Sequence, residues 1–390
     1  MKNKLLFTTV LVAAFLAALI SCTRDEKESA FVLKPNLPAS PYSYALSMPP
    51  GFRVPDSNIH FFFGFSFNPA NPQITDLGAT LGRVLFYDPQ LSLNNSVSCS
   101  SCHHQDKAFS DGKAFSTGFA GEVTPRSSMA ILNVGFNQNL FWDSRVSSAF
   151  ELSTKPIQNH IEMGMESMAR LTNKLSKIDY YPALFQQAFG DATISEERIG
   201  NALSQFVCSI SSGNSKFDRA QEKGFVDFTP QERLGFDLFM GSKTNCSRCH
   251  AAPNFAAPDF VGGEYGSDFF GDPFNGGGAN LRGGANNGLE LSYKDNGMGN
   301  GRFRIPSLRN IAVTGPYMHD GRFTTLNEVI EHYNSGIVSH PNLDKNLKNE
   351  NGAPLRMNLN IVEKQALIAF LHTLTDDSMM SDVKWSNPFN

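Results

Sequence analysis

The sequence predicts a mainly α-helical chain built from two similar halves, and three observations support this fold class. Leu-Gly-Arg-Val-Leu-Phe at residues 81–86 is matched by Leu-Gly-Phe-Asp-Leu-Phe at residues 234–239, both with apolar residues at helical spacing. Each copy is followed by the same short cysteine- and histidine-containing motif. Each motif is followed much later by an amphipathic segment, at residues 195–210 and 362–374. Two domains of one plan are therefore expected.

The start of the chain is typical of an exported protein. Positive charges precede an apolar run over residues 5–20, and Ser21 stands directly before Cys22. This pattern predicts a signal peptide over residues 1–21, and the small residue before a cysteine resembles a bacterial lipobox. The apolar run is short for a membrane span. We therefore expect cleavage, a lipid anchor on Cys22, and a location on the periplasmic side of an inner or outer bacterial membrane.

Net charge, helix-capping residues and glycine content indicate how the rest of the chain is organised. The chain of 390 residues has a net charge of −4, which favours no nucleic-acid partner. Residues 22–70 are expected to form a tether and N-terminal extension. The first domain is expected at 71–222 and the second at 223–390, because Thr-Pro-Gln-Glu at 229–232 is a capping box that begins a new helix. A glycine- and asparagine-rich stretch, about 262–301, is expected to be an irregular, exposed loop.

Two C-x-x-C-H motifs carry the strongest chemical signal. They read Cys99-Ser100-Ser101-Cys102-His103 and Cys246-Ser247-Arg248-Cys249-His250. In this motif, two thiols three residues apart reach the two vinyl groups on one edge of a porphyrin, and the next residue places its imidazole under the iron. The pair predicts two covalently bound c-type haems, with His103 and His250 as proximal ligands.

Two other interpretations of these cysteines are weaker. A zinc site needs four ligands brought together, and paired zinc-ribbon motifs usually lie about 15 to 20 residues apart, far closer than these two. A thioredoxin-like dithiol needs no histidine after its second cysteine and belongs to a βαβ pattern, which the sequence lacks. Cys208, within the amphipathic segment 195–210, is expected to be a small core residue.

The segments after each motif complete a common plan. Each has an apolar stripe at helical spacing, formed by Ile199, Leu203, Phe206 and Ile210 in the first half and by Leu367, Phe370, Leu371 and Leu374 in the second. Helix, haem motif, loop and closing helix is the plan of a cytochrome c domain. We therefore expect two cytochrome c-like domains in tandem, each carrying one covalently bound haem.

Three further blocks carry a family resemblance. They are Phe-Trp-Asp-Ser-Arg at 141–145, Arg-Ile-Pro-Ser-Leu-Arg-Asn at 304–310 and Thr-Gly-Pro-Tyr-Met-His-Asp-Gly-Arg at 314–322. From about residue 70 onward the chain resembles the bacterial di-haem cytochrome c peroxidase family, and within it the MauG-like branch. The resemblance implies that the N-terminal haem reacts with hydrogen peroxide, that the C-terminal haem passes electrons, and that Trp142 lies between them.

The same resemblance implies the residues of a peroxide pocket. Glu162 stands at the position of the family's acid–base glutamate, where a carboxylate can move the peroxide proton to the leaving oxygen. Leu152 stands where the family has a glutamine, and His160 either supplies polarity instead or lies at the surface. Phe119 stands where many relatives have a histidine ligand. Since phenylalanine cannot bind iron, the first haem is expected to keep an open coordination position.

The sixth ligand of the second haem is expected to be a tyrosine. Many relatives have a methionine fourteen residues after the histidine of the His-Asp-Gly block, and here, after His319, that position is Tyr333, as in the MauG-like branch. A phenolate is a hard anionic donor that stabilises ferric iron, so a low reduction potential is expected. Met318 and His332 are the alternatives if Tyr333 only packs.

The resemblance finally implies a second metal, an activity and partners. A calcium ion between the haems would be held by the carbonyls of Thr314 and Pro316 and, in place of the family's asparagine, by Ser127. The expected activity is two-electron reduction of hydrogen peroxide to water with electrons from a small donor protein such as a cytochrome c. The alternatives are a MauG-like oxidase that modifies a partner protein and a non-catalytic electron carrier. Relatives are often dimers, so a homodimer is allowed.

Overall fold

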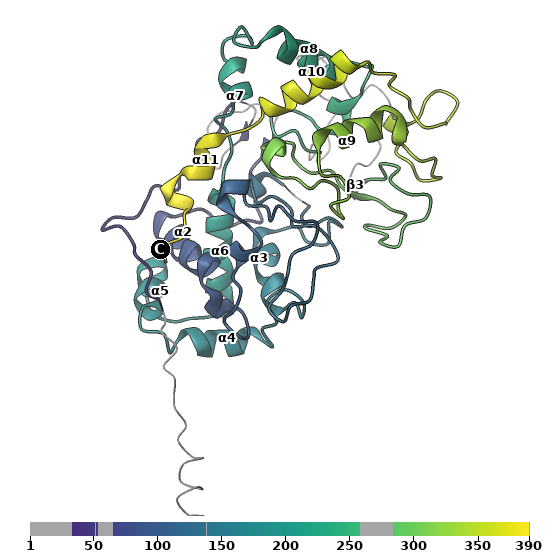
Figure 1. Cartoon of the computed structure of the whole chain (residues 1–390). Helices are drawn as coiled ribbons and strands as arrows, with labels where there is room; N and C mark the ends of the chain where they lie inside the picture. Colours follow the sequence, from purple (N-terminus) through teal and green to yellow (C-terminus); the bar gives the residue numbers. More distant parts are fainter. Residues whose placement is uncertain (1–32, 51, 54–64, 138, 258–283, 390) are drawn as a thin grey trace, which may run out of the picture. The chain divides into compact units, whose positions relative to one another are not determined.

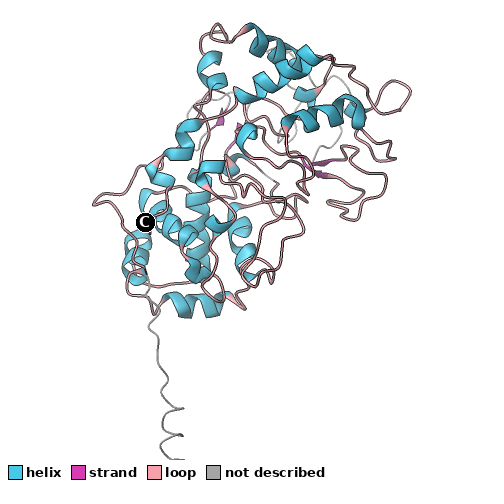
Figure 2. Ribbon diagram, viewed as in Figure 1, coloured by secondary structure: helices cyan, strands magenta, loops and turns pink. Residues whose placement is uncertain are grey.

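The computed structural model describes residues 33–50, 52–53, 65–137, 139–257 and 284–389. Short helices joined by long loops make up these residues, with little sheet (Figure 2), so the predicted mainly α-helical class is confirmed. The expected signal peptide and Cys22 lie outside the described residues. None of the helices in the described ranges is both long and apolar enough to span a bilayer.

The helices fall into two groups along the chain (Figure 1). The first group is α2 (Asp76–Tyr87), α3 (Ala149–Gln158), α4 (Met168–Leu175), α5 (Tyr181–Phe189) and α6 (Glu196–Ser209). The second group is α7 (Lys216–Gln221), α8 (Pro230–Met240), α9 (Leu326–Glu331), α10 (Ile361–His372) and α11 (Asp377–Ser381).

The strands described are only two residues long. β1 (Phe52–Arg53) pairs in parallel with β2 (Phe65–Ser66), and β3 (Gly284–Ala285) pairs antiparallel with β4 (Phe303–Arg304). Sheet therefore contributes little core, and the helices and loops position the site.

The two halves share an equivalent glycine-mediated helix contact. A Cβ built on Gly82 of α2 would lie 2.0 Å from the carbonyl oxygen of Ala202 in α6, and one built on Gly235 of α8 would lie 1.9 Å from that of Ala366 in α10. In each pair the helices therefore pack backbone to backbone. This agrees with the internal duplication predicted from the sequence, and the capping box at Thr229 is present.

Each half has its own hydrophobic core, and the predicted apolar stripes lie within these cores. Ile199, Leu203, Phe206 and Cys208 are buried in the first cluster, and Leu367, Phe370, Leu371 and Leu374 in the second. Phe217 of α7 already belongs to the second cluster, just before the expected boundary at 222. Met379 and Trp385 return to the first cluster, so the last residues of the chain pack on the first half.

Two segments expected to be loosely attached are packed. Tyr44, within the expected N-terminal extension, is 1% exposed, and its phenol donates to the carbonyl of Lys384. The expectation of surface exposure is wrong for the start of the described part of the glycine-rich stretch, where Asn286 is 1% exposed. Its side chain accepts from the Gly288 amide and donates to the Asn300 carbonyl. Irregular backbone can be buried there because an amide side chain satisfies its polar groups.

Candidate active site

A cavity of about 1070 Å³ is lined by both halves of the chain. It contains most of the residues singled out in the sequence, namely Cys99, Cys102, His103, Ser127, Trp142, Leu152, His160, Glu162, Cys246, Cys249, His250, Thr314, Pro316, Met318 and Tyr333. His332 and Phe119 are not among the lining residues. This volume is at the upper end of the range of about 300 to 1000 Å³ that is usual for small-molecule pockets. The two motifs that line the cavity fit a pair of haems.

The first motif is shaped by a short 3-10 turn over Cys99–Ser101. The amides of Cys102 and His103 both bond to the Cys99 carbonyl, at 3.2 and 3.1 Å, which brings the two thiols and the imidazole together. His103 Nδ1 lies 2.7 Å from the Phe109 carbonyl oxygen. Because a carbonyl only accepts, Nδ1 carries the proton and Nε2 keeps its lone pair for a metal. Burial lowers the pKa of His103, which keeps the ring neutral.

The second motif repeats this geometry. A 3-10 turn covers Cys246–Arg248, and the His250 amide bonds to the Cys246 carbonyl at 3.0 Å. His250 Nδ1 lies 3.1 Å from the carbonyl oxygens of both Phe255 and Pro306. Burial lowers the pKa of His250 to about 4. Both imidazoles are therefore neutral and oriented by backbone carbonyls, as expected of proximal haem ligands.

The thiols do not have the properties of a redox dithiol or a zinc site. Burial raises the pKa of all four, to about 12 for Cys99 and Cys249. A redox-active cysteine has a lowered pKa instead. In the described ranges, no group of three or more histidine, cysteine, aspartate or glutamate side chains could hold a metal ion. Neutral thiols beside an apolar cavity fit covalent attachment to a porphyrin.

Glu162 is the carboxylate that enters the cavity near the first motif. It follows α3, in a turn where Asn159 Oδ1 accepts from the amides of Ile161 and Glu162 at 2.9 and 3.2 Å. Burial raises the pKa of Glu162, and the positive charge of Arg145 partly opposes this. Leu152 and His160 line the same cavity, so the structure places both near the predicted pocket.

Phe119 packs outside this lining. A Cβ built on Gly164 would lie 2.3 Å from the Phe119 ring, and Gly164 has a φ of +68°. Glycine is favoured there both by the left-handed backbone and by the contact. The Phe119 amide also bonds to the Glu162 carbonyl at 3.0 Å. Phe119 therefore helps to fix the turn that carries Glu162.

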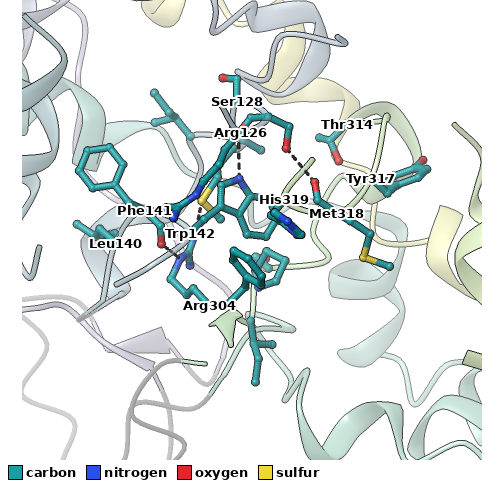
Figure 3. A pocket seen from close by; sticks show the side chains of 18 of the residues that line it. Arg126, Ser128, Leu140, Phe141, Trp142, Arg304, Thr314, Tyr317, Met318 and His319 are labelled. Carbon is teal, nitrogen blue, oxygen red and sulfur yellow. Dashed lines mark hydrogen bonds between the residues drawn. The ribbon is translucent and has the colours of Figure 1, made fainter. Parts of the chain in front are cut away.

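Trp142 lies between the two halves (Figure 3). Its indole Nε1 donates to the Ser127 carbonyl at 2.9 Å, and its own carbonyl accepts from the amide of Arg304, in β4, at 2.8 Å. The Ser127 amide donates to the His319 carbonyl at 2.8 Å, and Ser127 Oγ donates to the Met318 carbonyl at 2.8 Å. A chain of hydrogen bonds thus connects the indole to the loop of the second half.

An ion cluster beside Trp142 was not predicted from the sequence. Arg126 bonds to both oxygens of Asp295, at 2.6 and 2.8 Å, and to Asp143 at 2.7 Å. Asp143 also accepts from Arg145 at 2.8 Å. Burial alone would raise the pKa of Asp143, but the two arginines hold it below its usual value. Asp143 lies in the block 141–145, whereas Asp295 lies in the glycine-rich stretch, whose sequence gives no sign of this contact.

The structure places two of the candidates for the sixth ligand, Tyr333 and Met318, in the same region and His332 elsewhere. Tyr333 lies on a π-helical turn, His332–Gly336, directly after α9. Asn287 Nδ2 lies 3.5 Å from both Tyr333 Oη and Met318 Sδ, so both side chains point to one region of the cavity. His332 Nε2 is instead 3.0 Å from the Asn287 carbonyl oxygen. Burial raises the pKa of Tyr333 to about 12.

The residues predicted for calcium, Ser127, Thr314 and Pro316, all line the cavity. Ser127 Oγ donates to the Met318 carbonyl at 2.8 Å. Calcium stays a prediction.

Comparisons with known proteins agree with this site. A family model described as di-haem cytochrome c peroxidase matches residues 77–224. The chain is 31% identical over 307 residues to the methylamine utilization protein MauG of Methylophilus methylotrophus, covering 78% of this chain and 84% of that protein. It is 29% identical to the cytochrome c551 peroxidase of Nitrosomonas europaea, over 78% of this chain and 82% of that one.

A solved structure extends the agreement to the fold. A MauG-like protein associated with microbial copper homeostasis superposes with a TM-score of 0.69 at 30% identity, covering 88% of this chain and 97% of that one. The identity to MauG and its coverage show that the chain belongs to the di-haem cytochrome c peroxidase family, which includes MauG.

Proposed function

We propose that the chain is a di-haem peroxidase that reduces hydrogen peroxide to water with electrons from a small donor protein such as a cytochrome c. One observation carries this: a single cavity collects two haem-attachment motifs, whose imidazoles are neutral and oriented, together with a carboxylate and an indole. Membership of the family implies two c-type haems. Haem supplies an iron that binds peroxide and stores the oxidising equivalents.

The two halves would form cytochrome c-like domains in tandem, each holding one haem. Cys99, Cys102 and His103 hold the first, and Cys246, Cys249 and His250 hold the second. Phe217 packs in the second core, which supports a boundary just before α7 in place of the one expected at residue 222. Pyridine haemochrome analysis of purified protein should give two haems per chain, and Cys99→Ala/Cys102→Ala should leave one.

Glu162 would act as the acid–base residue. Its raised pKa moves it towards neutral pH, where a carboxyl group can both accept and return a proton. In the ionised form Glu162 would accept one proton of hydrogen peroxide and return it to the leaving oxygen, which would depart as water. Leu152 offers no hydrogen bond there, so Glu162 carries this role without the family's glutamine.

Trp142 would link the halves, and Tyr333 would bind the second iron. The indole donates to the Ser127 carbonyl and the backbone carbonyl of Trp142 accepts from the Arg304 amide, so Trp142 is held by residues of both halves. Tyr333 is favoured over His332 because His332 is bonded to backbone and does not line the cavity. Met318 is the remaining competitor, since it lies near the same Asn287 amide.

A second function is supported by Tyr333 and by the relatives named MauG. In this alternative, the oxidising equivalents are used to modify a partner protein. Mixing the holoenzyme with peroxide and reduced cytochrome c separates the two: rapid cytochrome oxidation supports the peroxidase, and a long-lived oxidised protein that ignores the cytochrome supports the modifying oxidase. Absence of any reaction with peroxide contradicts both and leaves an electron carrier.

Three further proposals concern the surroundings of the enzyme. Residues 1–21 would direct export to the periplasm and Cys22 would carry lipid, so Cys22→Ala should release the protein from membranes and abolish labelling by radioactive palmitate. Calcium would bind near Ser127, Thr314 and Pro316, which elemental analysis before and after EGTA tests. A homodimer would appear in sedimentation velocity.

A further inference from the structure

Two adjacent tyrosines in the first half share one buried carboxylate oxygen. Tyr180 Oη donates to Asp88 Oδ2 at 2.7 Å, and Tyr181 Oη donates to the same atom at 2.6 Å. The other oxygen, Oδ1, accepts from the Gln90 amide at 2.8 Å. Asp88 is only 2% exposed. Both phenolic protons therefore point at a carboxylate, which is a competent proton acceptor.

The two rings lead from the interior to the surface. Their centroids are 4.7 Å apart. Tyr181 is completely buried, while Tyr180 is half-buried and lies beside Phe389 near the end of the chain, with ring centroids 6.4 Å apart. An electron taken from Tyr180 can thus be replaced by a molecule at the surface, whereas Tyr181 is protected from solvent.

A short segment connects this pair to the first haem motif. The ring of Phe86, in α2, lies 6.5 Å from that of His103, and Tyr87 lies 5.2 Å from Phe86. Asp88 follows Tyr87 directly, and α5 packs beside α2 (Figure 1). Tyr87 itself donates to the Trp385 carbonyl at 2.7 Å. A carbonyl is a poor proton acceptor, so Tyr87 is less suited than Tyr180 or Tyr181 to lose a proton and an electron together.

We propose that Tyr180, Tyr181 and Asp88 form a one-electron oxidation site that carries oxidising equivalents from the first haem motif to the surface of α5. The proposal rests on the proposed reaction with peroxide, which is the oxidant. Once peroxide has taken two electrons from the two haems, Tyr180 or Tyr181 would return one of these electrons. Its phenolic proton moves to Asp88 Oδ2, leaving a neutral tyrosyl radical and a carboxylic acid. One electron from the donor protein, with return of the proton, restores the phenol.

The site would serve the enzyme when reduced donor is scarce. An oxidising equivalent held at the two tyrosines is kept away from the cavity, which is lined by Met129, Met163 and Met318. Methionine is a common site of oxidative damage. In the MauG-like alternative, the same site would be a second exit through which a partner at the surface of α5 could be oxidised.

The test uses holoenzyme, peroxide and no electron donor, with the spin trap 2-methyl-2-nitrosopropane. The tryptic peptide 178–198 contains Tyr180 and Tyr181 and no other tyrosine, tryptophan, methionine or cysteine. Mass spectrometry should find a trap adduct on this peptide, at Tyr180 because it reaches solvent. Tyr180→Phe should abolish the adduct at residue 180 and increase methionine oxidation in the cavity.

Two variants test whether the labelling depends on the Asp88 carboxylate or only on the solvent exposure of a tyrosine. Asp88→Asn keeps an acceptor oxygen but removes the base, so it should also lose the adduct. Tyr42→Phe is the matched control: Tyr42 is another half-buried tyrosine of the first half, but the guanidinium of Arg83 lies 5.4 Å from its ring. Tyr42 should be labelled only weakly by the spin trap, and Tyr42→Phe should leave the labelling of peptide 178–198 unchanged.

Peroxide consumption is measured in the same samples. Peroxide consumed without an adduct on peptide 178–198, or with an adduct that persists in Asp88→Asn, overturns the tyrosine site and leaves the proposed function intact. No consumption of peroxide overturns both. Should Asp88→Asn fail to fold, methionine oxidation in Tyr180→Phe decides: this variant removes only one hydroxyl from a half-buried ring, and methionine oxidation no higher than in wild type overturns the tyrosine site.

Discussion

Arg309 and Asp218 form a buried bidentate ion pair in the second half of the molecule. Arg309 Nη1 and Nη2 donate to the two carboxylate oxygens at 2.8 and 2.7 Å, and Nε donates to the Pro253 carbonyl at 2.9 Å. The side chains are 0% and 3% exposed. Arg309 belongs to the block 304–310, and Pro253 follows the second haem motif closely. Through its hydrogen bond to Pro253, Arg309 therefore holds in place the loop that follows His250.

Asp218→Asn should destabilise the holoprotein strongly. The substitution leaves the Arg309 charge buried without a counter-ion, which typically costs about 3 to 5 kcal/mol. Asp237→Asn is the control, because Asp237 pairs with Arg233 where both side chains are more than half exposed, and such pairs contribute about 1 kcal/mol or less. Denaturation by guanidinium chloride measures both. Equal effects of the two substitutions would contradict a special role of the buried pair.

The same pair predicts a loss of stability in acid. Burial by itself would raise the pKa of Asp218, but hydrogen bonds from Arg309 and Ser215 hold it below the ordinary value of 3.8. Because the folded-state pKa is lowered, its contribution is fully present above the unfolded value and is lost as the pH falls through the folded one. Melting temperatures recorded below pH 3.8 should drop more steeply for wild type than for Asp218→Asn.

Gly82→Ala and Gly235→Ala should destabilise their own halves by similar amounts. A methyl at either position would meet a backbone carbonyl at about 2 Å, at Ala202 or Ala366, and forced helix displacement costs about 1 to 3 kcal/mol or more. Gly336→Ala is the control, since its nearest contact would be 3.6 Å away. Calorimetry of the holoprotein checks this. A neutral effect at only one of the two glycines would show that the helix pairs are not equivalent.

The helices of the repeated plan could be predicted because their information is local. The repeated segment at 81–86 and 234–239 and the apolar stripes on α6 and α10 record which face is buried. The two motifs likewise contain both thiols and the imidazole within five consecutive residues. A short window is then enough to predict the helix and to single out the candidate ligand.

The features that the sequence did not predict depend on contacts between segments that lie far apart in the chain. Arg126 meets Asp295 across 169 positions, and Trp385 packs in the core of the first half although it lies at the end of the chain. Neither segment is periodic, so no pattern indicates its partner. The burial of Asn286 was missed for a related reason: glycine- and asparagine-rich sequence predicts irregular backbone, but it does not say whether side chains will satisfy that backbone internally.

Glu162→Gln should slow the reaction of the holoenzyme with peroxide by about 10²- to 10⁴-fold, the usual contribution of a general acid–base group. Burial raises the pKa of Glu162 above its usual value, and the ionised form must accept the first proton. The wild-type rate should therefore fall as the pH is lowered through this raised pKa, and the variant should lose that dependence. Stopped-flow absorbance measures it. His160→Gln, in the same cavity, should keep the wild-type pH profile.

A Tyr333 ligand and a Met318 ligand on the second iron lead to opposite expected results. If the phenol oxygen is the ligand, Tyr333→Phe changes the low-spin ferric signal in electron paramagnetic resonance, and Met318→Leu leaves it unchanged. Tyr333→Met should then raise the reduction potential of that centre, because a thioether stabilises ferrous iron better than an anionic oxygen does. Both side chains reach the same Asn287 amide at 3.5 Å, so either substitution disturbs that contact equally. A signal altered only by Met318→Leu would assign the iron to sulfur and remove the main structural support for a MauG-like oxidase.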